Sequence, residues 1–191
     1  MNEESNKESL DVLKQEPICY LEKEADWTLK KYSLEQIENW SNSKRIIIYS
    51  DDEQLKHFIE ECLIDKTYSK KLYFGIVSDV LADEVYERFH IDIHNFNCSL
   101  SGNEVRKILT DHGSEELEAA RGQRAVEYKD FMKIPYVISK PSAVLEGGEY
   151  RNKPCLKFVR NGYTVVGVVS DKHLDLFIQT MYIHKKEALP L

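Results

Sequence analysis

The residues best suited to chemistry lie in the last third of the chain, where three apolar runs follow one another. Arg160 and Tyr163 flank the pair Asn161-Gly162, and the last run contains Thr180 and Tyr182. If Asn161-Gly162 forms a two-residue hairpin turn, Arg160 faces Tyr163 across the two strands. A second short turn before the last run would place Thr180 opposite Tyr163. The sequence therefore predicts a row of Arg160, Tyr163 and Thr180, with Tyr182 just beyond it, at the rim of an apolar sheet face.

A cation beside hydroxyl groups suits the cleavage of RNA without a metal ion. This reaction needs a base for the proton of the 2′-hydroxyl, cations or donors for the non-bridging phosphate oxygens, and an acid for the leaving 5′-oxygen. His112 ends an apolar helix stripe and can act as acid or base, although the helix dipole favours its imidazolium form. The site cation is Arg160 or Lys157, which strand alternation places on opposite faces. The expected pairing with Thr180 favours Arg160.

Each of these residues also has a structural interpretation. His112 can simply cap its helix, and Arg160 can be a solvated residue beside a turn. Thr180 and Tyr182 are types that strands favour in any case. Their coincidence at one rim supports the functional interpretation.

The elements that must hold these residues follow from apolar periodicity. A period of two predicts an antiparallel meander, with strands over 143–146, 154–160, 163–169 and 174–183. Its expected turns are Gly147-Gly148, Asn161-Gly162 and Asp171-Lys172. A one-residue slip in this pairing would exchange the two faces of the sheet.

Helices are predicted ahead of the meander. Ser101 and Glu104 form a capping box that begins the helix ending at His112, and Gly113 is its expected stop. Ser114 restarts a helix that ends at Gly122. A short turn then runs through Asp130 and Phe131, before Pro135 and Pro141 break the regular structure.

The front of the chain predicts a different arrangement. The polar composition of residues 1–30 predicts an arm, and a capping box at 33–36 predicts the start of a short helix. The pattern of residues 44–91 predicts a strand–helix–strand–helix module. We therefore expect an α+β fold, in which N-terminal helices precede a four-stranded antiparallel β-sheet and a small α/β module precedes both. The expected divisions are 1–30, 31–100 and 101–191.

Composition limits the classes of protein that the chain can be. It has 191 residues, of which 42% are hydrophobic, and no apolar run approaches the length of a membrane span. Its first residues do not resemble a signal peptide, so we expect a cytoplasmic protein that makes no membrane contact. The four cysteines form no Cys-x-x-Cys pair, which predicts buried free thiols. His90 and His94 are spaced so that they could share a metal ion, but the sequence offers no third ligand near them. We therefore expect neither a metal site nor a cofactor.

Charge is unevenly distributed. The net charge is -7, but residues 1–65 hold 16 acids and 8 bases, and the remaining residues are close to neutral. A near-neutral region can still concentrate cations in one cleft, whereas a uniformly acidic protein would repel nucleic acid. We expect the acidic front to shield the cleft or to serve inhibition or delivery.

Several short motifs follow one another along the chain. They are Ile108–Gly113, Arg121-Gly122-Gln123, Asp130-Phe131, Ile134-Pro135, Pro141, the strand with Lys157-Phe158, and Gln179–Tyr182. In order and spacing, over roughly residues 72–183, they resemble the phage and mobile-element branch of the barnase/EndoU/colicin/RelE-like (BECR) nucleases.

The resemblance implies a metal-independent endoribonuclease, often a toxin, with its nuclease domain in residues 101–191. It assigns the family's catalytic histidine to His112 and its sheet cation to Lys157 or Arg160. It also assigns catalytic roles to Thr180 and Tyr182, because in the EndoU group a Thr or Ser two places before a Tyr lies in the active site. Tyr163, Arg121 and Gln123 would bind substrate. RNA is the expected partner, tRNA among the candidates, together with a cognate inhibitor protein. The EndoU pattern has two catalytic histidines, of which His112 is well matched. His173 and His184 are candidates for the second, without a matching context.

An alternative function fits the acidity of the chain. A non-catalytic protein on the same scaffold, such as a nuclease inhibitor or a structural component of a phage or mobile element, would present acids in place of phosphates. The Thr-x-Tyr and His-Gly motifs favour the RNA-cleaving enzyme.

Overall fold

The computed structural model describes residues 18–19, 28–41, 43 and 45–185. The predicted polar arm, residues 1–30, lies almost entirely outside this part of the chain, as does the side chain of Cys19. Among the described residues, none of the helices combines the length and the apolar character needed to cross a membrane.

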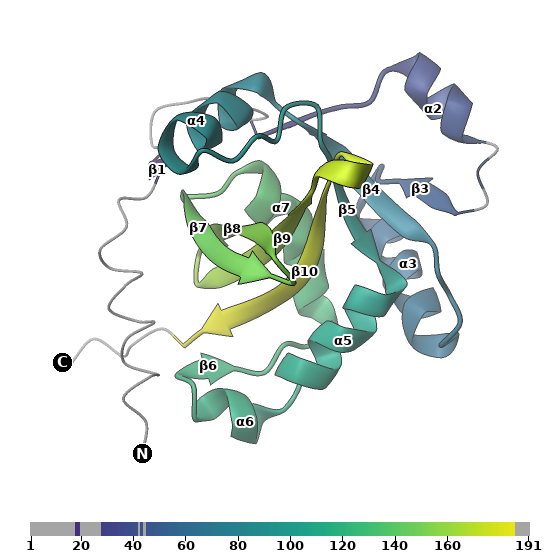
Figure 1. The fold of residues 1–191 in the computed structure, drawn as a ribbon. Coiled ribbons are helices and arrows are strands. Elements are labelled where there is room, and N and C mark those ends of the chain that lie inside the picture. The colour runs from purple at the N-terminus through teal and green to yellow at the C-terminus, as the bar shows by residue number, and fades with distance from the viewer. Residues whose placement is uncertain (1–17, 20–27, 42, 44, 186–191) are drawn as a thin grey trace.

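Within this part of the chain, ten strands join into one curled sheet (Figure 1). The order is β1-β7-β8-β9-β10-β5-β4-β2; β3 also pairs with β4, and β6 with β10. All neighbours are antiparallel except the pairs β5–β10 and β3–β4. The strands are β1 Ile18–Cys19, β2 Leu29–Lys30, β3 Ile46–Ile48, β4 Lys71–Val77, β5 Asn97–Ser101, β6 Gln123–Arg124, β7 Ala143–Tyr150, β8 Lys153–Arg160, β9 Tyr163–Ser170 and β10 Asp175–His184.

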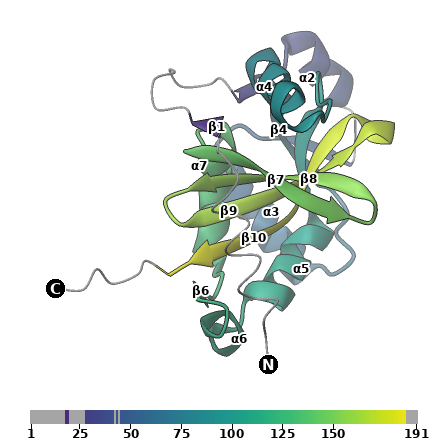
Figure 2. The ribbon, with the colours of Figure 1, turned by 60° about the vertical axis from the view of Figure 1, so that its left-hand side comes forward.

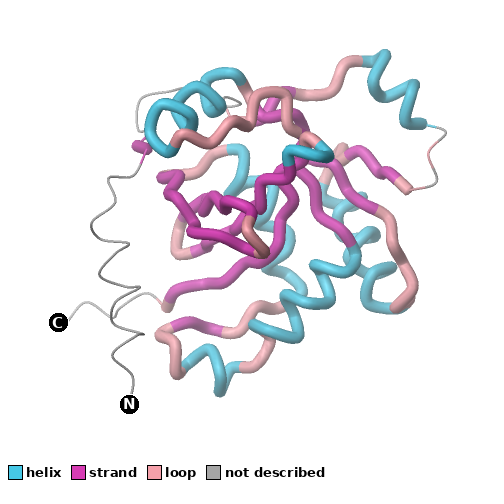
Figure 3. Tube along the Cα trace, viewed as in Figure 1, coloured by secondary structure: helices cyan, strands magenta, loops and turns pink. Residues whose placement is uncertain are grey.

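Helices surround this sheet, as the tube view shows (Figure 3). The helices are α2 Leu34–Ser41, α3 Asp52–Ile64, α4 Asp79–Phe89, α5 Gly102–His112, α6 Glu115–Ala119 and α7 Ile134–Ser139, with 3-10 turns η1 Tyr128–Lys133 and η2 Asp171–His173. Helix α7 packs on β8 and β9, and α5 runs along β10 (Figures 1 and 2). The end of α5 therefore lies beside the last strand.

Local sequence signals explain where several helices begin. The predicted capping box forms between Ser33 and Gln36, each of which bonds the backbone N–H of the other. Asp51 and Ser78 cap α3 and α4. Pro135 does not break the chain as expected, because it occupies the first turn of α7, where the missing N–H has no helical partner to lose.

The sheet has two apolar faces of unequal size. The core face packs into the main hydrophobic core through Leu156, Phe158, Val165, Val169, Leu176, Ile178, Met181 and Ile183. The second face carries a smaller cluster of Cys155, Val166 and Val168, with Tyr150, Phe177 and Tyr182 packed against it. The chemistry of the two faces therefore has to be considered separately.

The mixed α+β class is confirmed, but the four-stranded sheet as expected is wrong in detail. The predicted meander is present as β7 to β10, yet it continues through β5 into β4 and thus joins the predicted front module in one sheet. The parallel pair β3–β4 of that module is present. The sheet also runs across residue 100, where we expected a division between domains.

The turns of the meander differ in how well they were predicted. Asn161-Gly162 is the expected turn, with φ of 51° and 83°, and Arg160 faces Tyr163. Strand β7 instead passes through Gly147-Gly148 with a register shift, and the chain turns at Arg151-Asn152, whose φ values are 52° and 59°. The expected two-residue turn at Asp171-Lys172 is replaced by η2, followed by Leu174 with φ of 45°.

Candidate active site

His112 is held by a glutamate that the sequence analysis did not single out. Helix α5 ends at His112, and Ser114 caps the short helix α6, which turns the chain back. This return brings Glu118 Oε2 to 3.1 Å from His112 Nδ1. The glutamate side chain is fully buried and the histidine side chain is 16% exposed. The contact through Nδ1 directs Nε2, on the far side of the ring, away from Glu118.

Arg121 completes this group from the other side of the carboxylate. Its Nη1 lies 2.6 Å from Glu118 Oε1, and its side chain is 53% exposed. Burying a carboxylate is costly unless charged or polar partners compensate for the lost water. Arg121 and His112 supply those partners, so Glu118 fixes both side chains at one place.

Two aromatic side chains of β10 continue the site. The Tyr182 ring lies 6.1 Å from the His112 ring and 5.3 Å from the His184 ring, measured between centroids. Gln123 on β6 pairs directly with His184 and therefore points to the same side of the sheet. A second histidine, for which the sequence offered no matching context, thus lies beside Tyr182.

Two polar atoms near these rings are buried without a hydrogen-bond partner in the described part of the chain. They are Oε1 of Gln123 and Oγ1 of Thr180. A buried polar atom without a partner costs roughly 1–3 kcal/mol and requires an explanation. Both atoms belong to residues that we expected to contact substrate.

A register shift in β10 decides on which face Thr180 lies. Ile178 pairs with Gly167, but Thr180 pairs with Val166, so Gln179 is an extra residue in the strand. Beyond this bulge the alternation is reversed, because Met181 and Ile183 enter the core while Tyr182 joins the second face. The predicted pairing of Thr180 with Tyr163 is wrong, since Tyr163 pairs with Ile183.

The predicted row of Arg160, Tyr163 and Thr180 is therefore not formed. Arg160 lies on the core face, where its guanidinium donates to the carbonyl of Lys140 at the end of α7 and lies 4.4 Å from the centroid of the Tyr136 ring. Its Nε is buried without a partner among the described residues. The structure brings Arg160 to a helix end and separates it from Thr180.

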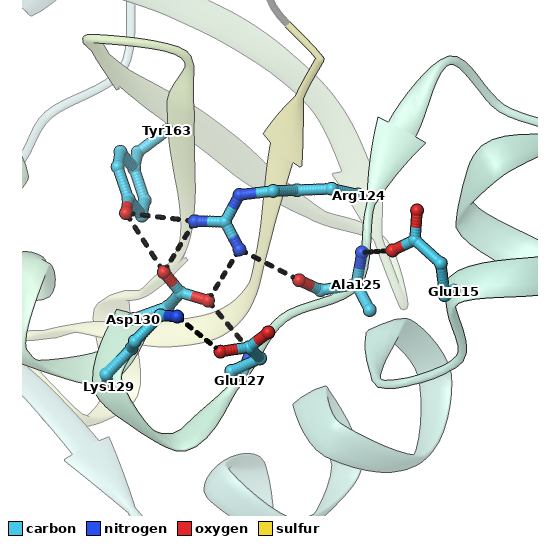
Figure 4. A network of polar contacts seen from close by, with 7 residues as sticks. All are labelled: Glu115, Arg124, Ala125, Glu127, Lys129, Asp130 and Tyr163. Carbon is cyan, nitrogen blue, oxygen red and sulfur yellow. Dashed lines mark hydrogen bonds and ion pairs between the residues drawn. The ribbon is translucent and has the colours of Figure 1, made fainter.

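Tyr163 belongs to a polar network on the core face, drawn in Figure 4. Its hydroxyl donates to Asp130 Oδ1 at 2.9 Å, and Arg124 binds both oxygens of Asp130, at 2.6 and 2.8 Å. Burial alone would raise the pKa of the Asp130 carboxyl, but bonds from Arg124, the Glu127 N–H and Tyr163 hold it below its usual value. Burial and Asp130 together raise the pKa of Tyr163.

Lys157 lies on the face that Thr180 occupies. Lys157 pairs with Val166, and Val166 pairs with Thr180 on its other side, so the three side chains form one row across β8, β9 and β10. Of the two cations left open by the sequence, Lys157 lies on the face that carries Thr180 and Tyr182, and Arg160 does not. The earlier preference for Arg160 followed from the wrong register.

Glu118 is the site residue that sequence reasoning missed. A capping serine at 114 predicts a helix that begins just after His112, and a glutamate in its first turn can then fold back towards the imidazole. That signal was present in the sequence. Of the two candidates for a second histidine, the structure places His184 beside Tyr182, because the bulge in β10 determines the face on which it lies.

Comparison with known proteins identifies a family for the chain. Neither the curated proteins nor the solved structures gave a match. The comparison with protein families matches residues 75–189, more than half of the chain, to the phage-Barnase-EndoU-ColicinE5/D-RelE like nuclease3 family. This range contains the meander and every residue of the candidate site. The chain belongs to that family of nucleases, PBECR3.

Proposed function

We propose that this protein is a metal-independent endoribonuclease of the toxin type. The observation that carries the proposal is the buried Glu118. Its Oε2 contacts Nδ1 of His112, whose ring lies beside Tyr182, and its Oε1 accepts a hydrogen bond from Arg121. A histidine whose ring is oriented by a carboxylate is suited to exchange a proton through its other nitrogen. Membership of a nuclease family makes a phosphodiester the substrate to consider first.

The reaction uses the groups of the second face. His112 Nε2 takes the proton of the 2′-hydroxyl, whose oxygen forms a bond to phosphorus while the bond from phosphorus to the 5′-oxygen breaks. The products are a 2′,3′-cyclic phosphate and a free 5′-hydroxyl, which receives its proton from His184. Arg121 and Lys157 bind the non-bridging oxygens, where charge increases in the transition state. Thr180 and Tyr182 position the phosphate or a base.

The direct test is cleavage of total RNA in the presence of a chelator. We expect the wild-type protein to produce fragments with 2′,3′-cyclic phosphate ends. His112→Ala should lower the rate by about 10²- to 10⁴-fold, the usual contribution of general acid–base catalysis. RNA left intact by the wild-type protein at high concentration would contradict the proposal and favour the non-catalytic acidic binder. Activity that His112→Ala leaves unchanged would also contradict it.

A further inference from the structure

A polar cavity of about 240 Å³ lies on the second face, at the opposite end of α5 and β10 from His112. Lys71, Lys153, Asp175 and Phe177 are among the residues that line it. Glu104, in the first turn of α5, also lines it, whereas His112 is the last residue of that helix. Eight residues of helix separate the two, which corresponds to about 12 Å. The cavity thus lies a few nucleotides away from the candidate active site.

Lysines without acidic partners connect the cavity to the site. Lys153 and Lys157 alternate on β8 with Cys155 between them, so both point to the second face. Lys107 of α5 lies 5.0 Å from the centroid of the Tyr150 ring. Among the described residues, none of these three lysines forms an ion pair with an acid. They are therefore cations that remain available on an otherwise acidic protein.

Two acids line the cavity, Asp175 and Glu104, and both are engaged, since Ser101 donates to Glu104. Asp175 is 3% exposed in its side chain and lies 3.1 Å from Lys71 Nζ, and Ser99 donates to both of its oxygens at 2.8 Å. Burial raises the pKa of Asp175, although Lys71 and Ser99 act against this shift. Because Lys71 pairs with it, this carboxyl opposes a bound phosphate less than an unpaired carboxylate would. Lys153 Nζ lies 3.0 Å from Ser170 Oγ and 6.0 Å from the centroid of the Phe177 ring.

We propose that this cavity is a second nucleotide subsite, in which Lys153 binds a phosphate of the same single-stranded RNA and the Phe177 ring receives a base. Between the cavity and His112, the RNA strand contacts Lys157 and Lys107. Tyr150 contacts it beside Lys107. Unpaired cations interleaved with aromatic rings are the means by which proteins bind single strands with little sequence preference. The cavity is smaller than the roughly 300–1,000 Å³ of drug-sized ligand sites and suits a single nucleotide unit. This subsite rests on the proposed function, since its ligand is the substrate strand.

The test compares a long and a short ligand. Binding of a labelled 2′-O-methyl RNA octamer is followed by fluorescence anisotropy, because this backbone has no 2′-hydroxyl to attack and the readout does not require catalysis. Cleavage of an unmodified RNA dinucleotide is measured in parallel. Lys153→Gln should weaken octamer binding about three- to ten-fold and leave dinucleotide cleavage unchanged. The slope of log binding constant against log salt concentration should decrease by the amount expected for about one phosphate contact. Phe177→Leu should weaken octamer binding by a similar factor.

Lys172→Gln is the matched control, since Lys172 is exposed on η2 and does not line the cavity. Thermal unfolding of each variant shows whether the fold is intact. Octamer binding that Lys153→Gln and Phe177→Leu do not change overturns the subsite, even if RNA is cleaved. Binding that depends on Lys153 without any cleavage supports the subsite and overturns the proposed catalysis. Absence of octamer binding overturns the subsite and favours the non-catalytic acidic binder.

Discussion

At the scale of single residues, the central feature is the contact of Glu118 with His112. A carboxylate on Nδ1 stabilises the tautomer in which Nδ1 carries the proton and Nε2 can accept one. Because the carboxylate is fully buried and also binds Arg121, it cannot rotate towards solvent without losing two partners. The proposed catalytic histidine therefore depends on a residue that does not itself contact substrate.

Replacing Glu118 by Gln tests this dependence. The amide keeps the shape of the side chain but removes the charge that holds the imidazole and the guanidinium. We expect kcat for RNA cleavage to fall by about 10-fold or more, with a smaller change in KM, because positioning acts mainly in the transition state. Initial rates over a range of RNA concentrations would measure both constants.

Glu116→Gln is the control for this prediction. It makes the same change of charge on the same helix, but Glu116 is exposed. We expect it to keep wild-type kinetics. Equal losses in the two variants would show that net charge, and not the contact with His112, is responsible.

At the scale of elements, the bulge in β10 and the network around Asp130 determine the geometry of the site. The bulge directs Thr180, Tyr182 and His184 to the second face. The network holds β6, because Arg124 binds Asp130 and the Ala125 N–H donates to Glu115 Oε2 at 2.9 Å (Figure 4). Since Arg121 and Gln123 precede Arg124 in the chain, the network supports the edge of the site from the core side.

Asp130→Asn tests the network through its pH dependence. The folded pKa of Asp130 is below its usual 3.8, so the ionised carboxylate stabilises the fold. This stabilisation is complete above the unfolded pKa and is lost as the pH falls through the folded pKa. We expect the Asn variant to lose roughly 1–3 kcal/mol of unfolding free energy at pH 7. Its difference from wild type should decrease as the pH falls below about 4.

Urea unfolding at a series of pH values would provide these free energies. Asp111→Asn serves as the control, since Asp111 is exposed on α5. A difference between wild type and Asp130→Asn that stays constant from pH 7 to pH 3 would contradict the assigned role.

At the scale of the whole molecule, charge is separated along the chain. Residues 1–65 carry a net charge of -8 and the rest of the chain +1, while the second face gathers Lys107, Lys153 and Lys157. Long-range repulsion slows the approach of a polyanion, and salt screens it. The acidic front should therefore weaken RNA binding at low salt.

Changing Glu3, Glu4, Glu8, Asp11 and Glu16 to the corresponding amides tests this effect of charge. The net charge moves from -7 to -2, because five negative charges are removed. We expect RNA association to become about two- to ten-fold faster at low salt, with little difference at high salt. Stopped-flow association rates at several salt concentrations would measure it, and unchanged rates would refute a shielding role.

Removing residues 1–65 altogether would not test shielding. Helix α3 lies within this segment and contributes Leu55, Phe58, Ile59 and Cys62 to the main core. Losing four buried apolar side chains at about 2–5 kcal/mol each costs roughly 8–20 kcal/mol. This loss is as large as the roughly 5–15 kcal/mol that stabilises a typical domain, and the newly exposed core adds to it. Substitution of charges leaves this helix in place.

Much of the fold was determined by the sequence alone, because the governing interactions are local. Capping side chains at Ser33, Asp51 and Ser78 bond backbone groups within three residues, and Asn161-Gly162 adopts the positive φ that its turn requires. Apolar periodicity likewise predicted the four strands of the meander, and the Asn161-Gly162 turn predicted the pairing of Arg160 with Tyr163. Such signals need no knowledge of distant residues.

The face on which each site residue lies was decided only by tertiary structure. One extra residue, Gln179, reverses the alternation in β10, and no local signal distinguishes it from a regular strand residue. Packing makes this choice, since it buries Met181 and Ile183 and leaves Tyr182 beside His112. The sequence could thus name His112, Lys157, Thr180 and Tyr182 as chemical groups. Their assembly, with Glu118 and without Arg160, required the long-range contacts of the folded chain.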